Sequence, residues 1–426
     1  MKVLLISANT ERINLTPLPL GLSCVAAAVR GAGHDVRMID LMADGDNRSA
    51  VGRAIGSFRP DVIGISVRNI DDQNMEDPRF LLAGVRGVVE ECRRLCGAII
   101  VLGGAGYSIF PESALEYLEA DMGIQGEGEE AFPILLERLE NKADLRGTPG
   151  LYLRRFGLQG KRRFSKSLDR FPFPDVHVPS FTSTPGEIWV PVQTSRGCPM
   201  ACSYCSTPVI EGRTIRKRSP ERAVEEISRH VEAGFRNFYL VDNVFNLPLP
   251  HVKAFCEKII ERGLEISWRC ILYPGKMEGG LADLMARAGC VEAGLGFESG
   301  CERVLRGMNK RFDLRAVRRT AALLHRSGIR VMGFLLLGGP DETKASVEES
   351  FDFADSLPLE AVTVTVGIRI YPYTALAKIA VQDGLVSRDD NLLMPRFYIA
   401  GGIRDWLYKT VRDRAGASRR WVIDSE

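Results

Sequence analysis

The sequence predicts an α/β protein in which an N-terminal doubly wound, Rossmann-like domain is followed by a partial (β/α)6 barrel and a short C-terminal tail. Short apolar runs alternate with amphipathic segments in the first third of the chain, and the alternation resumes with longer spacing after a proline-rich stretch. The expected divisions are 1–140 for the first domain, 141–185 for a linker, 186–375 for the barrel and 376–426 for the tail.

The first domain is expected to contain a parallel sheet of five strands. Their apolar cores lie at residues 3–7, 36–40, 62–66, 99–103 and 122–125. Between the first two strands, apolar residues recur at helical spacing, and Gly31 and Gly33 are suited to end that helix. Doubly wound sheets bind ligands beyond the carboxyl ends of their strands.

The barrel is expected to contain six strand and helix units, too few to close an eight-stranded barrel. The strands are predicted at 189–194, 237–241, 266–270, 292–297, 330–337 and 361–370. Ser219 followed by Pro220 has the chemistry of a helix start, and Asp313 is a second candidate N-cap. The tail beyond the barrel is too short to fold alone and is expected to pack over the barrel's carboxyl-terminal rim.

Composition excludes several classes of protein. The formal net charge of +2 gives no polyelectrolyte character, so nucleic acid is not the expected partner. No apolar run reaches the length of a transmembrane helix, and the start of the chain does not resemble a signal peptide, so a cytoplasmic location is expected. Ten cysteines in such a chain favour reduced thiols and metal ligation over a disulfide scaffold.

Three of the cysteines, Cys198, Cys202 and Cys205, lie within eight positions directly after the first barrel strand. Structural zinc takes four ligands, commonly from two paired-cysteine knuckles, and no second knuckle or nearby histidine follows here. Three thiolates on a four-iron cluster leave one iron open to a further ligand. The alternative is a zinc-stabilised loop completed by a distant cysteine.

This segment resembles the C-x-x-x-C-x-x-C signature of the radical S-adenosylmethionine (SAM) superfamily, including an aromatic residue, Tyr204, before the last cysteine. The resemblance implies a 4Fe–4S cluster whose open iron is chelated by SAM, and reductive cleavage of SAM to a 5′-deoxyadenosyl radical. It also implies an anaerobic reaction and an electron donor such as flavodoxin or ferredoxin.

The resemblance continues along the later barrel strands. The residues that it places near SAM are Tyr204, Asp242, Asn243, Glu298, Ser299, Gly338 and Arg369. Glu298 is expected near the ribose hydroxyls, because a carboxylate can accept hydrogen bonds from both of them. The alternative is that its charge lies at a helix N-terminus and interacts with the helix dipole. The sixth-strand segment departs from the family pattern, because Tyr373 stands where many relatives have glycine.

The first domain resembles the cobalamin-binding subclass of this superfamily. Glycine-bearing turns follow predicted strand ends, and glycine lets a broad ligand approach the backbone. The residues expected to contact cobalamin are Leu20, Gly21, Ser66, Arg68, Gly103, Gly104, Gly126, Glu127 and Gly128. The D-x-H-x-x-G signature that supplies a histidine to cobalt is absent, and His34 lies in a turn entering a strand. A dinucleotide site is disfavoured, because no G-x-G-x-x-G turn follows the first strand.

The resemblance implies methylation of an unactivated carbon in a small-molecule or lipid-like substrate, with methyl carried by cobalamin and a second SAM supplying the radical. Two alternatives remain open: a cobalamin-dependent cyclase or oxidase without methyl transfer, and a non-catalytic corrinoid or metal carrier. The aromatic and basic tail segment from Asp405 to Trp421 either touches the substrate or forms an amphipathic helix packed on its own domain.

Overall fold

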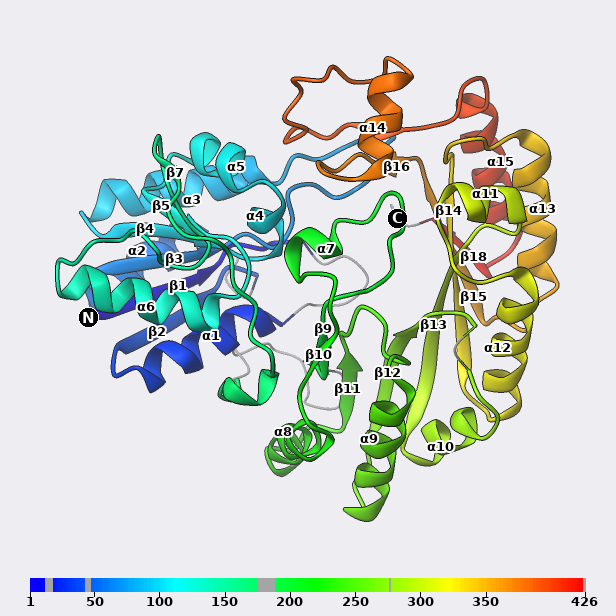
Figure 1. Ribbon diagram of the computed structural model, residues 1–426, viewed down its shortest axis with the longest axis horizontal. Helices are drawn as coiled ribbons and strands as arrows, with labels where there is room; N and C mark the ends of the chain where they lie inside the picture. The colour runs from blue at the N-terminus through cyan, green and yellow to red at the C-terminus, as the bar shows by residue number, and fades with distance from the viewer. Residues whose placement is uncertain (12–17, 43–46, 175–187, 276, 424–426) are drawn as a thin grey trace. The chain divides into compact units, whose positions relative to one another are not determined.

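The computed structural model describes residues 1–11, 18–42, 47–174, 188–275 and 277–423. The chain divides into two compact units. Unit 1 comprises residues 1–72, 79–184 and 209–212, and unit 2 comprises residues 73–78, 185–208 and 213–426. Each unit contains one large sheet (Figure 1).

The sheet of unit 1 is doubly wound, as the sequence predicts. Its strands are β1 (Lys2–Ser7), β2 (Asp35–Asp40), β3 (Val62–Ser66), β4 (Ile99–Gly103), β5 (Met122–Ile124), β6 (Leu151–Leu153) and β7 (Gly157–Leu158). They are ordered β2-β1-β3-β4-β5-β6-β7, and β1 to β5 are parallel. The strand order reverses between β1 and β3, and ligands of doubly wound folds bind at such a point.

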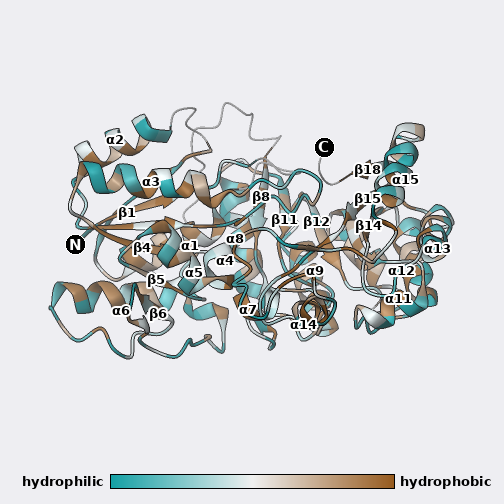
Figure 2. Ribbon diagram, turned by 90° about the horizontal axis from the view of Figure 1, so that it is seen from above, coloured by the Kyte–Doolittle hydropathy of each residue, from teal (hydrophilic) through white to brown (hydrophobic). Residues whose placement is uncertain are grey.

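Helices cover both faces of this sheet (Figure 2). Helix α1 (Leu20–Gly31) and helix α6 (Gly128–Glu140) pack together on one face, and α2 (Asn47–Phe58) and α3 (Leu82–Leu95) pack together on the other. The core under α1 and α6 is built from fully buried aliphatic side chains, among them Leu5. Burying each such side chain contributes about 1.5–3 kcal/mol. The apolar faces of the strands and of the helices therefore hold the sheet and the helix layer together.

Part of the stretch expected to be a linker forms a hairpin on the sheet edge. Strands β6 and β7 are antiparallel and extend the sheet beyond β5. Gly150 enters β6 at a φ of 67°, with Gln125 close against it, so that a side chain there would collide with backbone. The hairpin was not predicted, because strands of two or three residues are too short for apolar periodicity to reveal.

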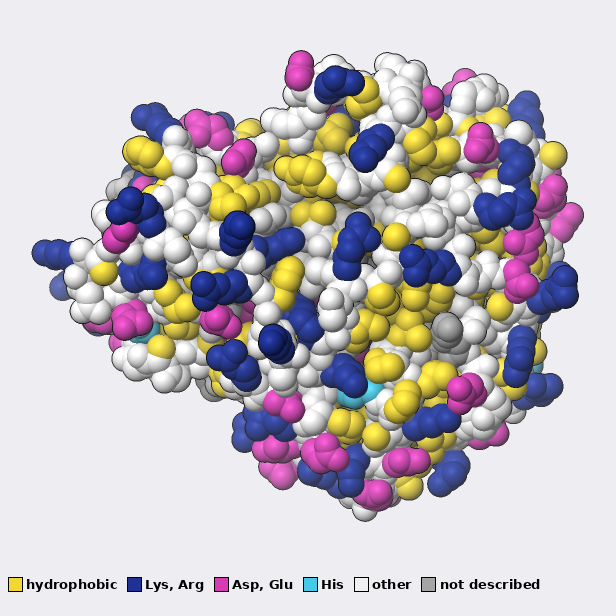
Figure 3. All heavy atoms as spheres, in the orientation of Figure 1, with side chains coloured by type: hydrophobic (Ala, Val, Ile, Leu, Met, Phe, Trp, Pro, Cys, Tyr) yellow, Lys and Arg dark blue, Asp and Glu magenta, His cyan; other side chains and the backbone are white. Residues whose placement is uncertain are grey.

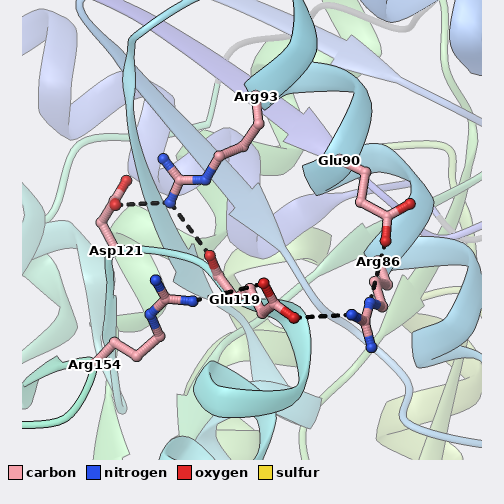
Figure 4. Close-up of polar contacts among 6 residues, drawn as sticks. All are labelled: Arg86, Glu90, Arg93, Glu119, Asp121 and Arg154. Atoms are coloured by element: carbon pink, nitrogen blue, oxygen red, sulfur yellow. Dashed lines mark hydrogen bonds and ion pairs between the residues drawn. The ribbon is translucent and has the colours of Figure 1, made fainter.

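An ion-pair network fastens this hairpin and α3 to the segment before β5 (Figure 4). Glu119, the C-cap of α5 (Pro111–Leu118), lies 2.8 Å from Arg86 and 3.9 Å from Arg154 of the hairpin turn. Arg93 of α3 binds Asp121 at 2.7 Å and also donates to the Glu119 carbonyl. Each exposed pair contributes little alone, but the network joins three elements at one edge.

The sheet of unit 2 is an open, parallel partial barrel. Its strands are β8 (Trp189–Val192), β11 (Asn237–Leu240), β12 (Ser267–Leu272), β13 (Cys290–Glu298), β14 (Arg330–Leu337), β15 (Ala361–Val366) and β18 (Trp421–Ile423). The order is β18-β15-β14-β13-β12-β11-β8, and every neighbouring pair is parallel. The six predicted strands are all present, and the tail adds β18 beside β15.

Helices line the outer face of this barrel sheet (Figure 1). They include α8 (Pro220–Glu232), α9 (Leu249–Glu261), α10 (Leu281–Arg287), α12 (Leu314–Arg326) and α13 (Lys344–Asp355). Both predicted N-caps are confirmed, since Ser219 accepts from the third residue of α8 and Asp313 accepts from Ala316 at 2.8 Å. Trp268 is fully buried between strand and helix, and its indole N–H donates to the Ala288 carbonyl at 2.7 Å.

The tail packs on its own unit. Helix α14 (Ala375–Gln382) is followed by β17 (Phe397–Tyr398), which pairs with β16 (Ile368–Arg369). Helix α15 (Arg404–Ala417) buries Leu407 and Val411, and its Arg414 guanidinium lies over the ring of Trp421. Among the described helices, none has the length and apolar character needed to cross a lipid bilayer.

Candidate cluster and cofactor site

The cysteine loop begins where β8 ends and belongs to unit 2. Gly197 turns the chain at a φ of 87°, after which Cys198 is buried and Cys202 and Cys205 are partly buried. Burial raises the pKa of Cys198 and of Cys202, and the neighbouring cysteines raise both further. The three sulfurs are therefore close enough to influence one another electrostatically.

The donor set fits an iron–sulfur cluster better than zinc. A tetrahedral zinc site with Zn–S bonds of about 2.3 Å holds its sulfurs only about 3.8 Å apart. Across the described parts of the chain, no three His, Cys, Asp or Glu side chains are grouped to hold a single metal ion. Three cysteines at this spacing can ligate three irons of a four-iron cluster and leave the fourth iron open.

Asp242 braces the start of this loop. Its carboxylate, at the end of β11, accepts from the Thr194 amide at 2.7 Å, the Thr194 hydroxyl at 2.5 Å, the Ser195 amide at 3.0 Å and the Ser195 hydroxyl at 2.9 Å. Burial raises its pKa to about 6, while these hydrogen bonds oppose the rise. Asp242 was predicted to lie near SAM, and both of its carboxylate oxygens accept hydrogen bonds from the two residues that begin this loop.

Two further barrel elements hold the loop in place. The Ser203 amide donates to the Met308 carbonyl at 3.0 Å, and the Asn309 side chain donates to the Ala201 carbonyl at 2.6 Å. From the start of α14, the Leu376 amide donates to the Ser203 carbonyl at 2.9 Å. The loop geometry is therefore fixed by hydrogen bonds from three sides, which lowers the ordering cost of receiving a cofactor.

Lys310 joins the loop to the end of β13. Its ammonium donates to the Tyr204 hydroxyl and to Glu298 Oε1, each at 2.9 Å, and its side chain is 5% exposed. Burial alone would lower the pKa of Lys310, but Glu298, Tyr204 and Cys202 together raise it well above its ordinary value. Glu298 itself has a φ of 63°, a strained conformation for a residue with a side chain.

Lys310 was not among the residues predicted to lie near SAM. A lysine twelve positions after a strand-end glutamate carries no local signal. Only the fold shows that both side chains converge on Tyr204. Glu298 and Tyr204, by contrast, are brought together at the cysteine loop as the sequence reading expected.

The turn after β14 is organised by a buried carboxylate. Gly338 has a φ of 99°, and its amide and that of Gly339 both donate to Glu342 Oε2, the second at 3.0 Å. The other oxygen, Oε1, is buried without a hydrogen-bond partner. Burial raises the pKa of Glu342 to about 7, against the effect of these amides.

The remaining predicted SAM contacts have mixed placements. Asn243 follows the Asp242 brace and accepts from Thr207, two residues beyond Cys205, at 3.3 Å. Ser299 is fully buried and bonded to Ser350 of α13 at 3.0 Å. The Arg369 guanidinium donates to four backbone carbonyls of its own tail region, those of Ile370, Leu392, Leu393 and Arg396. The contacts of Ser299 and Arg369 therefore serve the fold.

In unit 1, the predicted cobalamin residues gather at the carboxyl edge of the sheet. A pocket lies there, at the strand-order reversal. It is lined by residues following β1 and β3, including Asn9, Ser66 and Arg68, and by Leu81 and the first turns of α3. Pockets at this place are the usual ligand sites of doubly wound domains.

Three of the predicted glycines on this edge have close neighbours inside the fold. A side chain at Gly104 would lie 2.6 Å from the Val67 carbonyl, one at Gly126 would meet Arg162, and one at Gly128 would meet Val25. These three glycines are therefore explained by internal packing. Gly21 and Gly103 face open space, where a ligand can approach backbone.

Glu127 and His34 are also accounted for. The Glu127 carboxylate is buried and accepts from the Ser165 amide at 2.8 Å. His34 precedes β2, at the amino ends of the strands, where Nδ1 lies 3.3 Å from the chain's amino terminus. It is therefore on the edge opposite the pocket. Leu20 begins α1 at the carboxyl edge. Thr16 and Pro17, which precede it in the sequence, lie outside the described residues.

Comparison with known proteins gives independent findings on both units. Residues 6–136 match the B12 binding domain family model, and residues 192–354 match the radical SAM superfamily model. A protein of Pyrococcus horikoshii called uncharacterized methyltransferase PH0819 is 29% identical over 398 residues, covering 91% of this chain and 84% of the relative. The tryptophan 2-C-methyltransferase of Streptomyces laurentii is 24% identical, covering 87% of this chain and 73% of its own.

A solved structure shows the same architecture. It is the radical SAM methyltransferase TsrM from Kitasatospora setae with tryptophan substrate and a SAM analogue bound. The TM-score is 0.87 at 22% identity, over 99% of this chain and 90% of that one. At this identity the match establishes the shared fold. Together with the two family models it accounts for the chain from β1 to the tail.

Proposed function

This chain belongs to the cobalamin-binding subclass of the radical SAM superfamily, and from that premise we propose that it methylates an unactivated carbon of a small-molecule or lipid-like substrate. It is an enzyme of the cobalamin-dependent radical SAM methyltransferase family whose cofactors are a 4Fe–4S cluster, SAM and cobalamin. The observation that carries the proposal is the loop of three cysteines, held in place by hydrogen bonds with Asp242 and Asn309. Carbon as the acceptor is suggested by the name of one relative, the tryptophan 2-C-methyltransferase.

We assign the cluster to Cys198, Cys202 and Cys205, with Tyr204 and Asn243 beside it. Three thiolates on the cluster leave a net negative charge, and the ammonium of Lys310 next to Cys202 offsets part of it. The same ammonium holds Glu298 in place by an ion pair with a side chain only 15% exposed. Lys310 thus supports the thiolates and orients the carboxylate that we assign to the SAM ribose.

The glycine turn provides the other wall of the SAM site in this proposal. Glu342 holds the amides of Gly338 and Gly339 inward, so the outer surface of the turn is bare backbone that an adenosyl group can approach. In unit 1, we assign cobalamin to the carboxyl edge, with Gly21, Gly103 and the pocket that includes Ser66 and Arg68 as its contacts.

When bound, the cluster and SAM supply a carbon radical and cobalamin supplies a methyl carrier. The chain's own part is to fix three thiols on a loop that does not rearrange, to compensate their charge, and to keep the surrounding groups away from water. The buried brace at Asp242 and the buried lysine at 310 meet these needs, because electrostatic interactions are stronger where water is excluded.

The test is transfer of labelled methyl. The protein, reconstituted anaerobically with iron, sulfide and cobalamin, is incubated with trideuteromethyl-SAM and fractionated small molecules and lipids, and products are searched by mass spectrometry. We expect a product carrying the intact label, and no such product with Cys202→Ser. Release of 5′-deoxyadenosine without labelled product would contradict methyl transfer and favour the cyclase or oxidase alternative. Absence of both would favour a carrier.

A further inference from the structure

A strongly cationic segment, residues 154–170, directly follows β6 in unit 1. From residue 154 to residue 170 the chain has seven Lys or Arg and one Asp, a net charge of +6 in 17 residues (7 − 1 = 6), against +2 for the whole chain. These charged side chains belong neither to the cluster site nor to the pocket of unit 1.

Two of the seven cations are used inside the fold. Arg154 is turned back to Glu119 in the network at the sheet edge (Figure 4). Arg162 donates to the Val209 carbonyl. The other five are exposed: Arg155, Lys161, Arg163, Lys166 and Arg170. Figure 3 shows Lys and Arg side chains gathered over the part of this face where the segment runs below β7.

Apolar surface accompanies these charges. Phe156 in the hairpin turn is 79% exposed and Leu158 of the edge strand β7 is 46% exposed. Phe156 and Leu158 therefore add exposed apolar surface to the segment, and Phe156 directly follows the exposed Arg155. Apolar contact of this kind can hold a partner that charged side chains orient.

The segment is attached to the chain that leaves the cysteine loop. Arg162 binds the carbonyl of Val209, and Phe164 packs on Gly212, whose φ is 84°. Residues 209–212 belong to unit 1 and follow Cys205 by only four to seven positions. The cationic segment is therefore fastened to the polypeptide a few residues from the last cluster cysteine.

We propose that the exposed face of residues 154–170 is the docking surface for an acidic electron-transfer protein that reduces the iron–sulfur cluster. The inference rests on the cluster assigned to the three cysteines under the proposed function. The step is a one-electron transfer: the donor is oxidised by one electron and the cluster is reduced by one, and no proton or group moves. A net-negative donor is the partner that this charge selects.

Charge complementarity of this kind acts mainly on the rate of encounter. Steering by a cationic face raises association rates by about 10- to 1,000-fold at low ionic strength. The effect is lost at high salt, because the screening length falls to about 3 Å at 1 M. Electron-transfer partners use small interfaces. The hairpin turn and the short cationic segment that follows it therefore provide enough surface.

The experiment measures reduction of the reconstituted holoenzyme by an acidic flavodoxin in its hydroquinone form. The test variant is Lys161→Glu/Arg163→Glu/Lys166→Glu. A matched control, Arg287→Glu/Arg315→Glu/Arg319→Glu, makes the same change of charge on exposed residues of α10 and α12. The rate is followed by stopped-flow loss of the cluster's visible absorbance, at low and high salt. The final extent of reduction by excess dithionite is measured on the same samples.

We expect the second-order rate constant of the test variant to fall at least about tenfold at low salt, and the control to stay within about twofold of the parent. At high salt the three proteins should converge. Carbodiimide cross-linking should join Lys161 or Lys166 of the cluster-free parent to flavodoxin carboxylates, which gives a readout independent of the cluster.

Equal rates for the test variant and the control would overturn the proposal. It would also fail if the test variant were reduced normally yet lost binding to anionic vesicles, to nucleic acid or to cobalamin, since the charge would then serve that ligand. A failure of the proposed function gives a different result: excess dithionite would then leave the visible absorbance of the parent unchanged, because the parent would hold no reducible cluster. Phe156→Ser supplies a further check, with a slower rate and an unchanged salt dependence expected.

Discussion

The buried carboxylate of Glu342 makes the stability of unit 2 depend on pH. In the folded protein its pKa is raised by burial to about 7, whereas the unfolded chain titrates near 4.5. Between these values the native state holds a proton that the unfolded state has released, so stability falls as the pH rises. A separation of about 2.5 pKa units corresponds to about 3 kcal/mol, of which about 2.5 kcal/mol is lost between pH 5 and pH 8.

Glu342→Gln isolates this effect, since glutamine does not titrate. Any constant cost of the substitution is the same at both pH values and cancels in the comparison. Relative to the parent, the variant should therefore gain about 2.5 kcal/mol on going from pH 5 to pH 8. All four tryptophans, at 189, 268, 406 and 421, belong to unit 2, so tryptophan fluorescence in a urea titration reports the unfolding of this unit.

A control variant is available in the same turn. Asp341, next in the chain to Glu342, has no resolved role in holding the glycine amides, and Asp341→Asn should leave the pH dependence as in the parent. The reasoning would be refuted by a stability difference between parent and Glu342→Gln that is equal at pH 5 and pH 8. Such a result would mean that the carboxylate is already ionised at pH 5 in the folded state.

Three further outcomes follow from the site and the sheet edge. Lys310→Met leaves the carboxylate of Glu298 buried without its partner, and unfolding of the apoprotein should show a loss of about 3–5 kcal/mol. Cys202→Ser should retain the fold by circular dichroism while bound iron after reconstitution falls sharply, because a serine hydroxyl does not replace a thiolate. Gly104→Ala, with a φ of 100° and the Val67 carbonyl 2.6 Å from the added carbon, should lower stability by about 2 kcal/mol or more, measured on unit 1 by denaturant unfolding.

Features defined by local chemistry were predictable. The cysteine triplet is recognised from spacing, and the caps at Ser219 and Asp313 depend on a side chain and an amide three residues away. The parallel sheets follow from the alternation of short apolar runs with amphipathic helical segments. For these features the physical cause lies within a few residues of the pattern.

Features that depend on which segments meet in space were not predictable. Asp242 was predicted near SAM from the family resemblance, and its hydrogen bonds to Thr194 and Ser195 were not predicted. Arg369 was placed near SAM in the same way, and its hydrogen bonds to tail carbonyls more than twenty residues later were not predicted. Lys310 was not predicted as a site residue, because its partners come from two other elements.

The glycines illustrate the same limit in unit 1. A glycine-rich turn after a strand fits ligand binding and close internal packing equally well, and a sequence does not distinguish them. At Gly104, Gly126 and Gly128 the structure supplies a neighbour that explains the missing side chain. Only Gly21 and Gly103 retain open space, which narrows the expected contact surface for cobalamin.

The most direct test of the whole account is metal and corrinoid analysis of anaerobically reconstituted protein, with electron paramagnetic resonance of the reduced sample before and after SAM is added. The account predicts one 4Fe–4S cluster and one cobalamin per chain, and a reduced-cluster spectrum that changes on addition of SAM because one iron is open. Stoichiometric zinc at the three cysteines, or a cluster spectrum that SAM leaves unaltered, would contradict it.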